Sequence, residues 1–288
     1  MTTLRNLIFG ILTVISFSVF AQKVDTVTFK KGQQELDNSN FKEAIQLFSK
    51  VIAKSDFAPA YSERAAARWY LNDLKGAVED YTIAISLCPD SELYIHNRGL
   101  ANQQLNNYEA AISDFKTAIK LKPNNPGAYN DLGVVYDIVG NSEEAENAYT
   151  EGIKINSHFA KLYYNRGIVK ANREDYQGLI DDCTEAIKLD SLYTGAYYNR
   201  AKAYWNFKKY EEAITDFDKV ISIDPDYESG RAYYCRGMVK WSISNSFKDN
   251  VYETDVTTTQ EACSDFKIAC KKGIIEACNV LKTVSFCN

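Results

Sequence analysis

The chain has little of the chemistry on which most catalytic and metal sites depend. Its 288 residues include only two histidines, so neither a histidine-based metal site nor histidine acid/base catalysis is expected. The sequence contains no nucleophile elbow, P-loop, HExxH or glycine-rich dinucleotide motif. These absences predict a protein that is not an enzyme and that holds no cofactor and no metal.

Proline, glycine and positive charge are scarce as well. Five prolines and 14 glycines stand in a chain that is 45% hydrophobic and 25% charged, which excludes a disordered or collagen-like chain and permits a buried core. The formal net charge is -5, whereas nucleic acid and anionic lipid require a basic surface, so neither is an expected partner. Aromatic residues are abundant, with 20 Tyr and 14 Phe.

The first residues have the pattern of a signal peptide. Arg5 precedes an apolar run over 7–20, and Ala21 has the small side chain that a signal peptidase needs. A run of about 14 residues is shorter than the roughly 20 of a membrane span, and Gln22 is not the cysteine of a lipoprotein signal. We therefore expect residues 1–21 to be removed and the remainder to be exported, periplasmic or secreted, with no integral membrane span. An uncleaved anchor helix is the alternative.

From residue 25 onward the chain repeats with a period of 34 residues. Segments that begin at Pro126, Ala160 and Thr194 align without gaps: PGAYNDLGVVYDIVG, AKLYYNRGIVKANRE and TGAYYNRAKAYWNFK. Each unit is predicted to hold two helices. The predicted units cover 25–57, 58–91, 92–125, 126–159, 160–193 and 194–227, followed by a degenerate unit over 230–273 and a capping helix over 274–287.

The same kinds of side chain recur at fixed positions of each unit. Small residues at positions 8 and 20 and aromatic residues at position 24 form the helix-periodic buried face of two closely packed helices. Position 8 is occupied by Gly32, Ala65, Gly99, Gly133, Gly167, Ala201 and Gly237. Position 24 is occupied by Phe48, Tyr81, Phe115, Tyr149, Phe217 and Phe266, and proline follows the second helix at Pro89, Pro123 and Pro225.

This pattern resembles the tetratricopeptide repeat (TPR) family, whose 34-residue helix-turn-helix unit has the same small, aromatic and proline positions. The resemblance implies an all-α fold, a right-handed α-solenoid of about seven units whose first helices line a concave groove. The fifth unit departs from the pattern, with Leu179 at position 20 and Cys183 at position 24. We expect altered packing within that unit and an unchanged architecture.

Arginine at position 7 and aspartate at position 23 occur together. The fourth unit has Leu132 and Ala148 instead, and the first has Lys31 and Leu47. Two positions that change together within one chain suggest a pair in contact. Pairing within a unit gives every Arg a partner, whereas pairing with the next unit would set Asp114 against Leu132. The predicted structural ion pairs are Arg64 with Asp80, Arg98 with Asp114, Arg166 with Asp182, Arg200 with Asp216, and Arg236 with Asp265.

The resemblance also implies which side chains face the groove, namely positions 2, 5, 6, 9, 12 and 13. Some family members hold a peptide main chain with asparagine at position 6, because an amide donates and accepts at once. Aromatic residues at positions 5 and 12 would make the groove suited to an extended peptide, and a merely solvated inner face is the alternative. The predicted groove residues are Asn97, Asp131, Asn165, Asn199, Tyr164, Tyr198, Trp69 and Trp205.

The C-terminal part differs from the repeats. A polar insert predicts a loop over about 244–258, which either binds something or is surface disorder. Four of the seven cysteines lie after this insert, which in an exported chain favours disulfides over a metal site. The spacing of Cys270 and Cys278 resembles the cysteine pair of Sel1-like repeats, and Cys263 with Cys287 is a second, weaker prediction. The other cysteines are predicted to be buried thiols: Cys88, Cys183 and Cys235.

These patterns predict a non-catalytic scaffold or adaptor that binds a partner protein or peptide in its groove. The alternative is a periplasmic binding protein for cell-wall glycan or peptide. A glycan ligand would require Trp69 or Trp205 and would leave the asparagines at position 6 dispensable.

Overall fold

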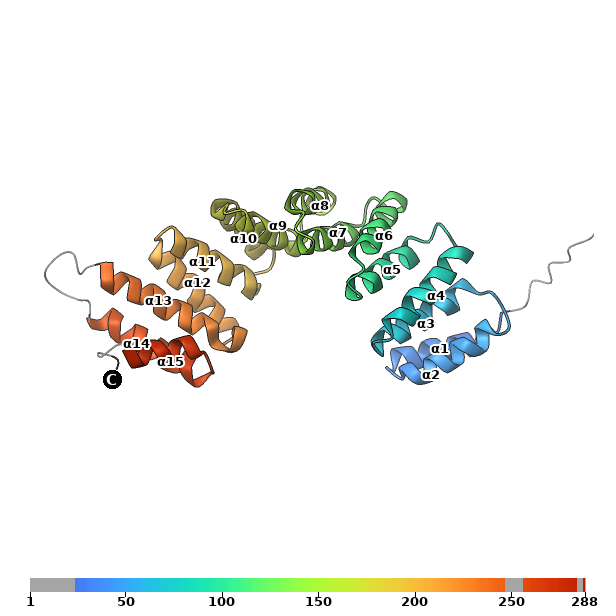
Figure 1. The fold of residues 1–288 in the computed structure, drawn as a ribbon, viewed down its shortest axis with the longest axis horizontal. Coiled ribbons are helices and arrows are strands. Elements are labelled where there is room, and N and C mark those ends of the chain that lie inside the picture. Colours follow the sequence, from blue (N-terminus) through green and yellow to red (C-terminus); the bar gives the residue numbers. More distant parts are fainter. Residues whose placement is uncertain (1–23, 247–255, 284–286, 288) are drawn as a thin grey trace, which may run out of the picture. The chain divides into compact units, whose positions relative to one another are not determined.

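The computed structural model describes residues 24–246, 256–283 and 287, and of Asn245, Ser246 and Val256 only the backbone (Figure 1). The predicted signal peptide over 1–21 therefore lies outside the described residues. Within the described ranges every element is helical, with fifteen α-helices, one short 3-10 helix and no strand. This confirms the predicted all-α fold.

The chain divides into two compact units, Met1–Asp90 and Ser91–Asn288. In the first unit each described helix packs against the next one, which gives two stacked helical hairpins. Its helices are α1 (Thr26–Asp37), α2 (Phe41–Ile52), α3 (Ala58–Tyr70) and α4 (Leu74–Leu87).

The second unit continues the same construction as a solenoid of helical hairpins, in which each α-helix again packs against the next along the chain. Its first six helices are α5 (Glu92–Gln104), α6 (Tyr108–Leu121), α7 (Pro126–Ile138), α8 (Ser142–Ile155), α9 (Ala160–Asn172) and α10 (Tyr176–Leu189). The rest are α11 (Thr194–Asn206), α12 (Tyr210–Ile223), the 3-10 helix η1 (Tyr227–Gly230), α13 (Arg231–Ser246), α14 (Val256–Lys271) and α15 (Ile275–Thr283).

The predicted bounds of the loop near the C-terminus are wrong. The helix α13 continues to Ser246 and α14 begins at Val256, so both helices extend into the loop predicted over 244–258. The hydroxyl of Ser244 donates to the carbonyl of Trp241 at 2.9 Å, which lets a polar residue continue the helix. The described part of the predicted capping helix is α15 (Ile275–Thr283), and residues 284–286 lie outside the described residues.

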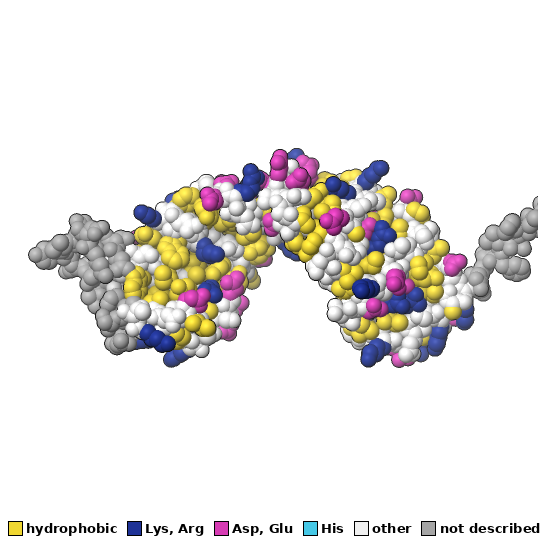
Figure 2. Space-filling model, in the orientation of Figure 1, with side chains coloured by type: hydrophobic (Ala, Val, Ile, Leu, Met, Phe, Trp, Pro, Cys, Tyr) yellow, Lys and Arg dark blue, Asp and Glu magenta, His cyan; other side chains and the backbone are white. Residues whose placement is uncertain are grey.

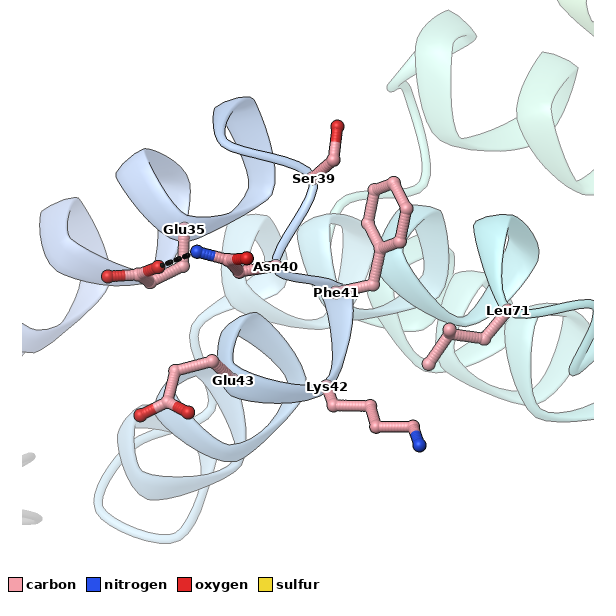
Figure 3. Close-up of a pocket in the computed structure, with 7 residues that line it drawn as sticks. All are labelled: Glu35, Ser39, Asn40, Phe41, Lys42, Glu43 and Leu71. Atoms are coloured by element: carbon pink, nitrogen blue, oxygen red, sulfur yellow. Dashed lines mark hydrogen bonds between the residues drawn. The ribbon is translucent and has the colours of Figure 1, made fainter.

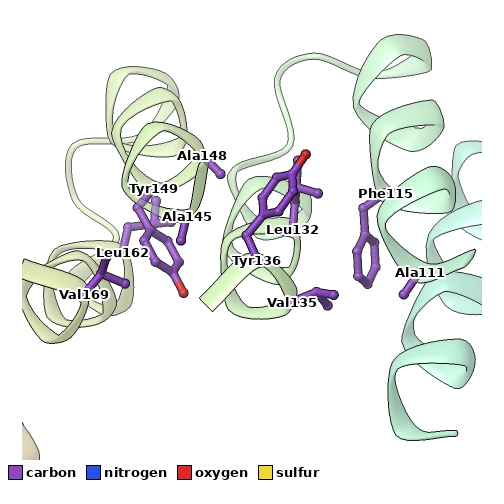
Figure 4. Close-up of a cluster of buried hydrophobic side chains, with 10 residues drawn as sticks. All are labelled: Ala111, Phe115, Leu132, Val135, Tyr136, Ala145, Ala148, Tyr149, Leu162 and Val169. Carbon is purple, nitrogen blue, oxygen red and sulfur yellow. The ribbon is translucent and has the colours of Figure 1, made fainter. Parts of the chain in front are cut away.

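The core of most hairpins is built on close contact between a small residue and an aromatic ring. A Cβ added at Gly133 would lie 2.5 Å from Cε1 of Tyr149, so only glycine fits against this ring. Figure 4 shows Tyr149 among the buried side chains that α6, α7, α8 and α9 contribute to one core cluster. The predicted contact between positions 8 and 24 is therefore the contact that packs α7 against α8.

In the fifth unit the large and the small side chain exchange positions. Cys183 stands where other units have an aromatic ring, and Leu179 stands where they have alanine; both are buried, at 0% and 4% exposed. The added Cβ of Gly167 would approach Leu179 Cδ1 to 3.2 Å. Leucine thus fills the volume that the missing ring would have taken, so the unusual pair keeps the hairpin closed.

Six helical hairpins turn through a residue in the left-handed conformation, always at position 15. Its φ lies between 58° and 81°, and only one of the six residues is glycine. A side chain in this conformation costs roughly 1 to 2 kcal/mol, less for asparagine. The residues are Ser39, Asn72, Asn106, Gly140, Glu174 and Lys208.

Replacing Lys208 by glycine should therefore stabilise the protein. We expect the free energy of unfolding to rise by about 0.5 to 1 kcal/mol in urea denaturation, because the left-handed strain is removed. The matched control is Lys219→Gly in the middle of α12, which should lower it by about 1 kcal/mol. Equal effects of the two changes would contradict the assignment of strain to position 15.

Two cysteine pairs hold the C-terminal helices together. Cys270 of α14 and Cys278 of α15 are bonded with their Cα atoms 4.8 Å apart, and Cys263 of α14 is bonded to Cys287 with a Cα separation of 5.3 Å. Of the other cysteines, Cys183 and Cys235 are buried, but the prediction of a buried Cys88 is wrong. Cys88 directly follows α4, where its side chain is exposed.

The two disulfides should differ in their effect on stability. The pair Cys263–Cys287 spans 24 residues and the pair Cys270–Cys278 spans 8. Since loop-closure entropy grows with loop length, Cys287→Ser should cost about 3.5 kcal/mol and Cys278→Ser about 2.5 kcal/mol. Hydrogen exchange in α14, with α6 as the internal control, measures both losses. A larger loss from Cys278→Ser would contradict the entropic ranking.

Candidate functional site

The first helices of the second unit are joined by hydrogen bonds between their side chains. We call the surface formed by positions 2, 5, 6, 9, 12 and 13 of α5, α7, α9, α11 and α13 the first-helix face. Each bond joins position 5 of one repeat to position 6 of the next. The four pairs are His96 with Asp131 (2.8 Å), Asn130 with Asn165 (2.9 Å), Tyr164 with Asn199 (3.0 Å), and Tyr198 with Cys235 (3.5 Å).

These bonds use amide hydrogens of two of the asparagines that were predicted to bind a peptide. Asn199 donates one amide hydrogen to the Tyr164 hydroxyl and the other to the carbonyl of Gly195 at 3.1 Å. The side-chain amide of Asn165 donates to Asn130, whereas the side-chain amide of Asn97 forms no hydrogen bond with a described residue. The row therefore joins repeats, and the Oδ1 atoms of Asn165 and Asn199 remain as acceptors. Sequence reasoning missed these bonds because it compared equal positions and not position 5 with position 6.

The two tyrosines predicted for the groove differ in exposure. Tyr198 is only 6% exposed and packs against Phe217 and Tyr227, with ring centroids 5.8 and 5.2 Å apart, so its predicted place in the groove is wrong. Tyr164 is half-buried and packs against Tyr193 at 4.8 Å. Burial raises the pKa of Tyr164, so its hydroxyl stays protonated at neutral pH and can donate while it accepts from Asn199.

The two predicted tryptophans lie in different units. Trp69 of α3 packs in the first unit against the cluster of Ala65, Ala77 and Tyr81. Trp205 of α11 packs in the second unit against the cluster of α11, α12 and α13. Both side chains are half-buried. Each indole is thus anchored in a core and keeps part of its surface open.

The structure places every predicted arginine against the aspartate of its own unit. The two side chains form parallel N–H···O bonds of 2.5 to 3.0 Å in all five pairs. The aspartate side chains are 1 to 7% exposed. The bond to Asp80 raises the pKa of Arg64, which keeps the guanidinium charged. These bidentate pairs join the two helices of a hairpin.

The same arginines reach back to the preceding repeat. Their Nη1 atoms donate to position 25 of the repeat before. The bonds are Arg64 to Ser49 (2.9 Å), Arg166 to Thr150 (3.1 Å), Arg200 to Thr184 (3.0 Å), and Arg236 to Asp218. These bonds could have been predicted from the sequence. The fourth repeat has Leu132 in place of the arginine, and position 25 of the repeat before it is Lys116, which cannot accept a hydrogen bond.

The fourth repeat replaces the ion pair with an apolar contact. Leu132 and Ala148 are both 7% exposed and belong to the buried cluster of Figure 4. Lys116 stands at position 25 of the repeat before, where other repeats have an acceptor for the arginine, and its Nζ lies 5.6 Å from the ring centre of Tyr136. The chain therefore contains both a polar and an apolar version of the same helix contact.

A cavity of about 550 Å³ lies at the turn between α1 and α2 of the first unit. Its lining is Glu35, Ser39, Asn40, Phe41, Lys42, Glu43 and Leu71 (Figure 3). The amide of Asn40 donates to Glu35 at 2.7 Å, and the other groups point outward around the turn. The cavity contains none of the predicted groove residues.

Comparison with known proteins supports the resemblance to the tetratricopeptide repeat family. Residues 104–137 match its TPR repeat, and residues 126–159 and 195–227 match its tetratricopeptide repeat. No curated protein matches the chain. Three segments of the chain thus match the repeat of this family, while the export signal and the Sel1-like end remain predictions.

Solved structures share the fold. The C-terminal part of a TPR repeat-containing protein from Cytophaga hutchinsonii is 18% identical with a TM-score of 0.70, covering 88% of this chain and 99% of its own. A tetratricopeptide repeat protein from Parabacteroides merdae is 19% identical with a TM-score of 0.62, covering 89% and 97%. YrrB, described as a TPR protein with an unusual peptide-binding site, is 20% identical with a TM-score of 0.55, covering 71% and 99%.

Copying the apolar pair of the fourth repeat into the sixth should restore most of the stability that a broken ion pair loses. Asp216→Ala alone should lower the free energy of unfolding by about 3 to 5 kcal/mol, because Arg200 loses its buried carboxylate. Arg200→Leu combined with Asp216→Ala should cost clearly less than Asp216→Ala, since no unpaired charge remains. Urea denaturation measures both. A double change that costs as much as Asp216→Ala alone, or more, would show that the unpaired buried charge is not the cause.

Proposed function

We propose that the chain is a non-catalytic scaffold that binds a partner protein or peptide on the first-helix face of its second unit. The observation that carries this proposal is the aromatic and aliphatic surface of that face, where Trp205, Tyr234 and Met238 are half-buried on consecutive first helices. Figure 2 shows hydrophobic side chains gathered over the segment from α11 to α14. Aromatic residues anchored on one side and open on the other are the usual energetic centres of protein interfaces.

The hydrogen bonds between repeats determine how a partner would bind. Because position 6 of α7, α9, α11 and α13 is already bonded to position 5 of the preceding first helix, these four helices do not need a ligand to hold the row together. A partner would gain free energy from burying side chains on the open aromatic surface. It would gain direction from the remaining acceptors, such as Oδ1 of Asn199 and Oδ1 of Asn165. YrrB, which shares the fold, is described as having a peptide-binding site, and this analogy supports a peptide ligand here.

We also propose that the protein works outside the cytoplasm. The support is the predicted signal over 1–21 together with the two bonded cysteine pairs, since disulfides persist in oxidising compartments. No described helix is long and apolar enough to cross a membrane.

Binding of cell-wall glycan is the second candidate function, and an exposed aromatic shelf in the first unit favours it. Tyr70 is 69% exposed and stacks on Phe41 with ring centroids 4.7 Å apart. Phe41 also lines the cavity of Figure 3, beside the polar groups of Glu35 and Asn40. A flat ring beside carboxylate and amide groups suits a sugar. This candidate site takes the place of Trp69 and Trp205 as the expected glycan contact, and glycan pull-down that is lost on Tyr70→Ala would favour it over the scaffold.

Site-specific photocrosslinking in the native host tests the scaffold proposal. A photoreactive phenylalanine derivative is placed at Gln104 or Asn206, which are exposed at position 13 of α5 and α11. We expect both to capture the same protein or peptide. The matched controls are Glu211 and Lys219, exposed on the second helix α12. Equal capture from α12, or no capture from the first-helix face, would overturn the proposal.

A further inference from the structure

Two consecutive first helices present an aromatic and aliphatic site around one lysine. Position 9 is Lys202 on α11 and Met238 on α13, and position 12 is Trp205 on α11 and Trp241 on α13. Lys202 is exposed, whereas the other three side chains are half-buried. Trp205 forms no hydrogen bond with a described residue, so its indole N–H is free to donate.

Lys202 forms no ion pair with a carboxylate of the described residues. Its Nζ lies over the ring of Tyr198, 5.5 Å from the ring centre. Arg231, a second cation of the helices α11 and α13, is already paired with Glu276 at 2.9 Å. The charge of Glu228 reaches Tyr198 and Cys235, as the charge of Lys202 reaches Cys235, but no ion pair joins Glu228 to Lys202. An acidic group next to an apolar side chain would complement this site.

The helix α7 carries the opposite charge on the same face. Asp131 accepts from His96 and from Asn130 (3.0 Å), and neither Asp131 nor Asp137 forms an ion pair with a lysine or arginine of the described residues. Asp137 is half-buried, and this burial raises its pKa. A cation supplied from outside would therefore relieve the partly desolvated carboxylate of Asp137.

The spacing of the two charged sites fits a short extended segment. The helices α7 and α11 are separated by α9, and packed helices lie about 8 to 10 Å apart, which gives a span of roughly 16 to 20 Å. An extended chain advances about 3.3 to 3.6 Å per residue, so five or six residues cover this distance.

We propose that the first-helix face binds an extended peptide segment of mixed charge, with a basic residue over Asp131 and Asp137 and an apolar residue next to an acidic one over Trp205, Met238 and Lys202. This inference rests on the proposed scaffold function and names its partner. The partner segment carries lysine or arginine, three to five residues of any kind, and then an aromatic or aliphatic residue beside aspartate or glutamate. The α7 end selects the positive charge, and the α11–α13 end selects the apolar and negative pair.

Selection from a phage-displayed library of random twelve-residue peptides on residues 22–288 tests the pattern directly. We expect enriched peptides to share a basic residue separated by three to five residues from an apolar–acidic pair. Enrichment of peptides without charge overturns the mixed-charge inference and leaves the scaffold function standing. If the library yields no binder, both the mixed-charge inference and the peptide ligand of the scaffold proposal are overturned.

A charge exchange at Lys202 then locates the bound acidic residue. Lys202→Glu should weaken the best enriched peptide about tenfold in fluorescence anisotropy, and replacing the acidic residue of the peptide by lysine should restore its affinity for this variant. The matched control is Lys219→Glu on α12, where the exposed lysine lies outside the face, and it should leave the affinity unchanged. Equal weakening by the two variants, or no recovery with the exchanged peptide, overturns the assignment.

A second substitution tests the α7 end independently. Asp137→Asn removes the charge and keeps the shape, and it should weaken the same peptide about threefold to tenfold. A peptide whose basic residue is replaced by glutamine should bind both proteins equally. If Asp137→Asn weakens that peptide as well, the effect is structural and the assignment of the basic residue to α7 is wrong.

Discussion

A buried aspartate that holds an arginine in two parallel bonds is the contact on which five of the repeats depend. Asp182 lies between two helices of one hairpin, and the guanidinium that it fixes, Arg166, extends to Thr150 of the repeat before. One arginine thus joins three helices. A charge buried to this degree is stable only when it is fully paired, so the helices have little freedom to slide against each other. In most hairpins the packing of a small residue on an aromatic ring closes the remaining space, and in the hairpin of Asp182 the side chain of Leu179 does so.

The first helices of the second unit have their own row of bonds, from position 5 of one repeat to position 6 of the next. The chemistry of the row changes along the chain: His96 with Asp131 is an ionisable pair, Asn130 with Asn165 is a pair of amides, and the Tyr198 hydroxyl meets the thiol of Cys235. The geometry is kept while the residues change. The row therefore holds neighbouring first helices in register, whichever groups form it.

Much of the fold could be predicted from the sequence because the repeat period reports on packing. The period of 34 residues predicts helical hairpins, and the joint change of Leu132 and Ala148 away from Arg and Asp points to the contact between their positions. The candidate site was predicted less well. The burial of Tyr198 does not follow from the repeat, because Tyr164 makes the corresponding contact, with Tyr193 as Tyr198 does with Tyr227, and is nevertheless half-buried. The bonds between positions 5 and 6 escape a comparison of equal positions, since unlike residue types form each of them.

Function in such a chain depends on the side chains that break the repetition. If every repeat offered the same groups to a ligand, an extended peptide could shift by one repeat and bind almost equally well. The bonds common to the repeats are satisfied within the protein, so they do not select a register. Lys202 and Asp137 have no counterpart of the same kind at their position of the first-helix face: position 9 is Val134 on α7 and Ile168 on α9, and position 12 is Ala171 on α9 and Trp205 on α11. A partner that uses these groups has only one alignment in which all of them are paired, and this is how a repetitive scaffold can bind a segment in a single register.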